Sequence, residues 1–141
     1  MENNYFEQKV RRINWAKYLA PEYYNSETMY FDPARPVKAL IQLSRFDGEE
    51  TESGTCVSND LLFAIGNDHR GTYYPAALEA IDLLIEIEKN SNNEKTRKCA
   101  KYFLNDLHYF QLEMSDIDED LYNSINNSIR EKLKPYSDEN L

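Results

Sequence analysis

Residues 75–89 read PAALEAIDLLIEIEK, and the apolar positions of this stretch decide the fold class. Pro75 suits the first turn of a helix, where its missing backbone N–H has no partner to lose. Apolar residues recur at helical spacing after it and spread around most of the helix, leaving Glu79, Asp82 and Glu86 as a narrow polar strip. Such a helix has to be covered by other elements on two or more sides.

The flanking sequence predicts five more helices. Strand-like alternation is almost absent, whereas apolar residues recur at helical spacing in most segments. Ser91 and Glu94 have the spacing of a capping box, and Gly66 with Asn67 reads as a helix stop. The expected helices are one carrying Phe6, Val10, Ile13 and Trp15, one running from Pro33 or Pro36 to about residue 46, one over 57–65, one following Glu94, and one over 118–134 that Pro135 ends.

The spacing of two prolines predicts how these helices are arranged. Pro36 and Pro75 each open a helix with an apolar row, and they are 39 residues apart. HEAT-type repeats have periods of roughly 40 to 47 residues. We therefore expect residues 1–141 to form a single all-α domain of about six helices, stacked as antiparallel hairpins in a short HEAT-like α-solenoid.

Acidic residues are concentrated in two stretches of the chain. The sequence has 25 acidic and 16 basic residues, a net charge of −9. The segments between Arg45 and Arg70 and between Lys101 and Arg130 each hold six acids and no Lys or Arg. Fields of this sign repel nucleic acid and attract basic partners, so no direct nucleic-acid binding is expected. Acidic loops kept only for solubility are the alternative.

The cysteines and the hydropathy indicate a cytoplasmic protein. Cys56 and Cys99 are far apart and have no C-x-x-C pair or histidine cluster near them, which predicts free buried thiols in a reducing compartment. The amino-terminal residues contain no apolar run of signal-peptide length, and no segment has the ~18 apolar residues of a membrane span. No membrane association is expected.

The segment SDIDEDLYNSI at residues 115–125 begins like a calcium loop. Such a loop needs Gly at its sixth position and Glu at its twelfth, where this chain has Leu121 and Asn127. The acids Asp116, Asp118 and Asp120 are therefore predicted to stabilise the start of a helix. No metal or cofactor is expected.

Residues 66–75, GNDHRGTYYP, combine residue types used in active sites with residue types used in turns. His69, Arg70 and Tyr73 could form a small catalytic or ligand-binding centre. The chain lacks a nucleophile–base signature or a phosphate-binding motif, so no enzymatic activity is expected. The glycines and Pro75 instead predict a joint between helices. Tyr73 and Tyr74, beside that proline, are as well suited to packing as to binding a partner.

Three segments carry a resemblance to a known family. They are WAKYLAPEYYN at 15–25, LLFAIGNDHRGTYYPAALEAIDLLIEI at 61–87 and CAKYFLNDLHYF at 99–110. Together they resemble small all-α immunity proteins of bacterial polymorphic toxin and contact-dependent growth inhibition systems. The resemblance implies a cytoplasmic inhibitor that binds one cognate toxin domain, often a nuclease, and blocks its active site or its nucleic-acid surface. It supplies no residue-level binding motif.

Charge and resemblance together predict an acidic surface that binds a basic nuclease domain, with RNase the expected class. A HEAT-like adaptor for another basic protein or peptide is the alternative function. The predicted partner-binding residues are Glu49, Glu50, Asp60, Asp68, His69, Tyr73, Tyr74, Asp116, Asp118, Glu119 and Asp120.

Overall fold

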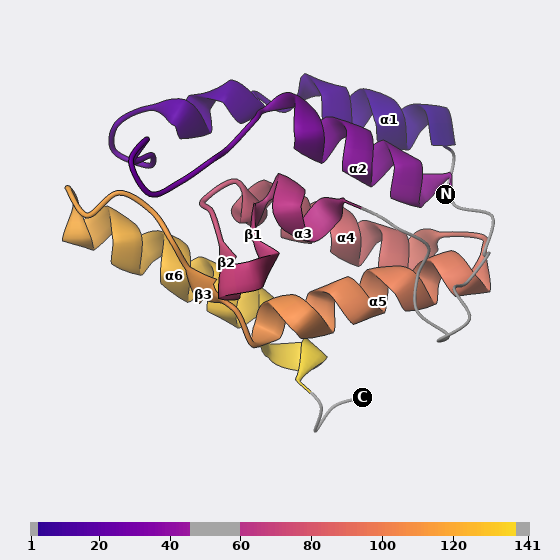
Figure 1. The fold of residues 1–141 in the computed structure, drawn as a ribbon. Helices are drawn as coiled ribbons and strands as arrows, with labels where there is room; N and C mark the ends of the chain where they lie inside the picture. The colour runs from indigo at the N-terminus through magenta and orange to yellow at the C-terminus, as the bar shows by residue number, and fades with distance from the viewer. Residues whose placement is uncertain (1–2, 46–59, 138–141) are drawn as a thin grey trace.

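The computed structural model describes residues 3–45 and 60–137, and this part of the chain is mainly helical (Figure 1). Its α-helices are α1 (Asn3–Arg12), α2 (Ala34–Ser44), α3 (Leu61–Ala64), α4 (Ala77–Asn90), α5 (Glu94–His108) and α6 (Glu119–Leu133). Short 3₁₀ turns cover Trp15–Leu19, Asp68–Arg70 and Lys134–Tyr136. The prediction of an all-α protein with about six helices is confirmed.

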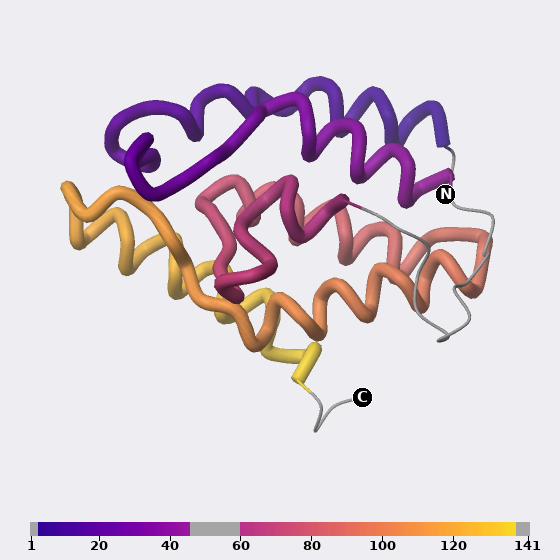
Figure 2. Tube along the Cα trace, viewed as in Figure 1, coloured from indigo at the N-terminus to yellow at the C-terminus, as the bar shows by residue number. Residues whose placement is uncertain are grey.

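Helix α4 lies at the centre of the molecule. It packs against α2, α5 and α6, while α1 packs on α2. Figures 1 and 2 show the α1–α2 pair on one side of α4 and the α5–α6 pair on the other. Ala77, Ala80, Ile81, Leu84 and Ile87 of α4 are fully buried. Coverage on several sides is what the narrow polar strip of this helix requires. Stacking of the hairpins as a HEAT-like solenoid stays a prediction.

Several helix ends differ from those predicted. The amino-terminal helix stops at Arg12, and Trp15 begins a separate turn in which its indole N–H donates to the Val10 carbonyl at 3.0 Å. The cap of α5 is Asn93, whose side chain accepts from two backbone N–H groups, so the capping box expected at Ser91 is wrong. Helix α6 ends at Leu133, just before Pro135 as predicted, and Pro135 lies within the 3₁₀ turn that follows. Asp118 caps α6 as predicted, accepting from Leu121 N–H at 3.0 Å.

The joint between α3 and α4 contains strands that the sequence did not indicate. Strands β1 (Gly66–Asn67) and β2 (Thr72–Tyr73) pair antiparallel, and β3 (Gln111–Leu112) pairs parallel to β2. The helix stop predicted at Gly66 and Asn67 is therefore the first strand of a small sheet. Two-residue strands are too short to show alternation, and β2 and β3 meet only after the chain has passed through α4 and α5.

Cys99 is disulfide-bonded and 2 % exposed, so the prediction of a free thiol at this residue is wrong. The other cysteine, Cys56, lies outside the described residues. Spacing along the sequence does not reveal which cysteines meet in the fold. Among the helices described, none is both long enough and apolar enough to cross a bilayer.

Candidate functional site

Tyr73 and Tyr74 are core residues, which corrects their prediction as surface anchors. Tyr73 is 0 % exposed and Tyr74 is 3 % exposed. Tyr73, the last residue of β2, lines a pocket with residues of α6, whereas the hydroxyl of Tyr74 accepts from the backbone N–H of Tyr30 in the loop that precedes α2. Burial raises the pKa of both phenols above their ordinary value. Neither ring is available to a partner at the surface.

The polar residues of the joint have separate neighbours. His69 packs edge to face on Phe63, with ring centroids 5.1 Å apart. Arg70 is ion-paired with Glu113 at 3.1 Å, and the same carboxylate accepts from Thr72 Oγ1 at 2.8 Å. Arg70 and Glu113 therefore hold the turn to the chain beside β3. His69, Arg70 and the buried Tyr73 do not converge on one point, so the catalytic constellation considered from the sequence does not form.

Two of the predicted acids between Arg45 and Arg70 lie in the described part of the chain, and they line one pocket together with Arg35 and Lys38. Asp60 accepts from Arg35 Nε at 2.9 Å and is ion-paired with that guanidinium. Asp68 is exposed, and its charge contributes to raising the pKa of Asp106, after burial of that carboxyl. Glu49 and Glu50 lie outside the described residues.

The second predicted acidic group is exposed. Asp116, Asp118, Glu119 and Asp120 all lie at the surface where α6 begins, and none of them forms an ion pair with a described residue. The positive end of the α6 dipole and the Asp118 cap stabilise this concentration of negative charge. The helix-start prediction is thus confirmed for Asp118, and the group remains free to act on a partner.

Two exposed apolar side chains lie at the same end of the molecule as these acids. Ile117 is 72 % exposed and Tyr30 is 71 % exposed. The loop carrying Tyr30 is joined to the segment before α6, because Ser115 N–H donates to the Tyr23 carbonyl at 3.1 Å. Figure 1 shows both segments at the end of the molecule where α6 starts.

We call this surface the acidic end. It consists of Glu22, Glu27, Tyr30, Asp116, Ile117, Asp118, Glu119 and Asp120, all of them exposed. Sequence reasoning identified the acids near α6 and missed Tyr30 and Ile117. An isolated isoleucine between two aspartates was the one local signal for an exposed apolar residue.

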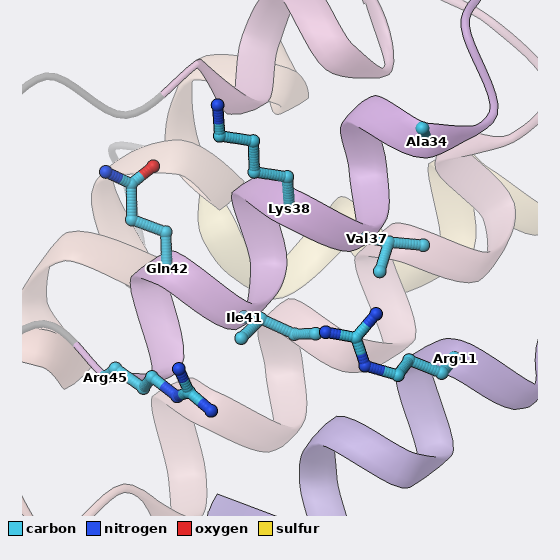
Figure 3. A pocket seen from close by; sticks show the side chains of 7 residues that line it. All are labelled: Arg11, Ala34, Val37, Lys38, Ile41, Gln42 and Arg45. Carbon is cyan, nitrogen blue, oxygen red and sulfur yellow. The ribbon is translucent and has the colours of Figure 1, made fainter.

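A groove of opposite charge lies between α1 and α2 (Figure 3). Arg11, Lys38 and Arg45 line it together with Val37 and Ile41, and its volume is about 880 Å³. Arg45 is ion-paired with Glu7. Figure 1 shows α1 and α2, which line this groove, on the other side of α4 from α6.

Over the ranges 3–45 and 60–137, no group of three or more His, Cys, Asp or Glu side chains is arranged as a metal site would require. No protein-family model, no curated protein and no solved structure matches this chain.

Proposed function

We propose that the protein is an immunity protein that binds and neutralises a cognate toxin domain, a basic nuclease, through the acidic end. The observation that carries the proposal is Ile117, an exposed apolar residue flanked in the sequence by exposed carboxylates that have no ion pair with a described residue. Interface hot spots combine an apolar anchor with a polar rim that excludes water. Tyr30, exposed at the same end of the molecule, supplies a second, aromatic anchor.

Electrostatics supports a basic partner. A nuclease presents cationic surface to phosphates, and a patch of carboxylates competes for that surface and accelerates encounter by steering. The acids of this end are exposed, and no described Lys or Arg forms an ion pair with them. Blocking the phosphate-binding surface would inhibit the nuclease without any chemistry on the part of the inhibitor.

The immunity function predicts that a large toxin gene lies directly upstream of this gene, and the test is co-expression with the carboxy-terminal domain of that toxin. We expect protection of the cells, a complex that co-purifies, and an affinity that falls as salt rises. A complex with a basic protein other than a toxin would support the adaptor function instead. Absence of both protection and complex would remove the immunity function.

A matched pair of double variants locates the interface. Asp116→Asn with Asp120→Asn removes two charges from the acidic end, one of them in the first turn of α6. Glu94→Gln with Glu131→Gln removes two exposed charges elsewhere, one of them in the first turn of α5. Both pairs change the net charge equally, so only the first should lower the association rate and weaken its salt dependence. Equal effects would place the interface elsewhere.

The anchor has its own test. Ile117→Ser removes the exposed apolar side chain without touching the core, so the free energy of unfolding should stay within about 0.5 kcal/mol of wild type. We expect dissociation from the toxin to accelerate at least tenfold, as for a hot-spot residue. Unchanged dissociation would show that the acids act without this anchor.

The proposal includes a cytoplasmic location, where such a toxin acts. Disulfides are uncommon in cytosolic proteins of mesophiles, so the redox state of Cys99 in cells tests this part of the proposal independently of toxin binding.

A further inference from the structure

A pocket of about 550 Å³ lies where the end of α5, strand β3 and helix α6 meet. Its size is in the range of pockets that hold small molecules. No acidic residue is found among the described residues that line it. The lining residues are Tyr73, His108, Tyr109, Phe110, Gln111, Tyr122, Asn126 and Arg130.

The Tyr73 hydroxyl is a buried polar group of this pocket with no hydrogen-bond partner among the described residues. Buried hydroxyls nearly always have a partner, because leaving one unsatisfied destabilises the fold. Arg130 acts on this hydroxyl as a hydrogen-bonding group and as a positive charge, and both effects oppose the rise in pKa that burial causes. No hydrogen bond of normal distance and angle joins the two side chains, and both line the pocket. Tyr122 already donates its own hydroxyl hydrogen to the Leu112 carbonyl, at 3.3 Å.

Arg130 is a half-buried cation that the fold holds in one orientation. Its guanidinium donates to the His108 carbonyl at 2.7 Å and to the Phe110 carbonyl at 3.4 Å, and it lies 3.4 Å from His108 Nδ1. These groups close the carboxyl-terminal end of α5, and they use only part of the five N–H donors of a guanidinium. No described acid is ion-paired with Arg130, although acids outnumber bases in this chain.

We propose that this pocket binds a small organic oxyanion, held by the Arg130 guanidinium and by the Tyr73 hydroxyl. A carboxylate or phosphate oxygen would accept from both donors. It would give the Tyr73 hydroxyl a hydrogen-bond acceptor and the Arg130 guanidinium a negatively charged partner. The rings of Phe110, Tyr109 and Tyr122 provide apolar and aromatic surface for the rest of the molecule. The site shares no residue with the acidic end, so a test of oxyanion binding does not depend on whether the immunity function is correct.

Calorimetric titration of the full chain tests the site with three probes: inorganic phosphate, adenosine monophosphate and benzoate. Binding of the nucleotide but not benzoate identifies a phosphate site, the reverse identifies a carboxylate site, and binding of both supports the shared oxyanion chemistry. Failure of all three probes to bind, at concentrations up to 10 times the highest expected dissociation constant of about 1 mM, overturns the proposal.

The decisive variant is Tyr73→Phe, which keeps the buried ring and removes only the hydroxyl. We expect the affinity for the bound probe to fall about tenfold or more, the range for a hydrogen bond to a charged group. Thermal stability without ligand should be unchanged or higher, because the variant no longer buries an unsatisfied group. Tyr102→Phe, at a ring 58 % exposed and outside the pocket, is the matched control. Equal affinity of wild type and Tyr73→Phe overturns the assignment.

Arg130→Lys provides a second readout. Lysine keeps the charge but loses the planar, multiple-donor geometry of arginine. Affinity should fall for the same probe that Tyr73→Phe weakens, and circular dichroism should remain helical. A folded Arg130→Lys chain with undiminished affinity would also contradict the proposal.

Discussion

The hydroxyl of Tyr74 accepts a hydrogen bond from the backbone N–H of Tyr30 at 3.1 Å, across 44 residues of sequence. The Tyr74 ring also packs edge to face on Phe31, with centroids 6.3 Å apart. This one buried side chain therefore holds the loop before α2 to the joint that leads into α4. Tyr30 is thereby presented at the acidic end with its own ring in solvent.

Replacing Tyr74 by Phe should loosen that loop while leaving the core packed. The variant removes one hydrogen bond, so we expect a loss of about 1 kcal/mol in the free energy of unfolding, measured with urea. Hydrogen exchange at the Tyr30 amide should become faster. Tyr102→Phe, at an exposed ring, should change neither quantity. An unchanged exchange rate at Tyr30 would mean that other contacts hold the loop.

Gly66 should tolerate no side chain. A Cβ at this position would lie 2.1 Å from the Thr72 carbonyl oxygen and 2.6 Å from the Tyr73 Cα, both backbone atoms of the paired strand. We expect Gly66→Ala to cost about 3 kcal/mol or more, because the hairpin has to separate.

Gly71 is the matched comparison for that variant. Its φ is +65°, and the nearest atom to an added Cβ is 3.9 Å away in the Phe110 ring. Gly71→Ala therefore meets only backbone strain, about 1 to 2 kcal/mol, and Gly71→Asn should cost less because Asn adopts this conformation more readily. Equal losses for the alanine variants at the two glycines would contradict the close approach of β1 and β2.

Tyr136 should make the stability depend on alkaline pH. Burial, the charge of Glu88 and the hydrogen bond to that carboxylate raise the pKa of Tyr136 from 10.0 to about 12. The folded state keeps the proton that the unfolded state loses, so this stabilisation is complete below pH 10 and is lost as pH rises through about 12. The difference in free energy of unfolding between wild type and Tyr136→Phe should shrink across this interval. A constant difference would show that the phenol titrates normally.

Cys99 should resist alkylation until it is reduced. In denaturant without reductant, iodoacetamide should leave Cys99 unmodified because the residue is disulfide-bonded. After reduction, peptide mass spectrometry should find it labelled. The same measurement on protein alkylated inside cells reports whether Cys99 is oxidised there. That redox state tests the proposed cytoplasmic location. Full labelling of Cys99 without reductant would contradict the disulfide.

Local patterns in the sequence were sufficient to predict most helices. The apolar positions of 75–89 predicted a helix covered on several sides, and α4 is buried against three other helices. Asp118 was correctly placed at the start of α6, since a cap bonds to residues two or three positions away. For α5 the sequence predicted a cap at Ser91, whereas the cap is Asn93. Several polar residues near the start of this helix match the capping pattern equally well.

The candidate site could be predicted only in part. The acids at the start of α6 are close together in the sequence, so their charge was evident. Their association with Tyr30 depends on the contact between Ser115 and Tyr23, which no local pattern records. The burial of Tyr73 depends on strand pairing with residues beyond α5, and that of Tyr74 depends on contacts with the loop before α2. The Tyr73 pocket depends on residues of α6 that line it.

The sequence by itself determined the class of the protein, because helix formation depends on side chains within a turn or two of each other and charge depends on composition alone. Tertiary structure decided which tyrosines face solvent, that Cys99 is bonded, and that Arg130 lies beside an unsatisfied hydroxyl. Each of these depends on residues brought together across long stretches of chain, where the geometry is set by packing of whole helices on α4.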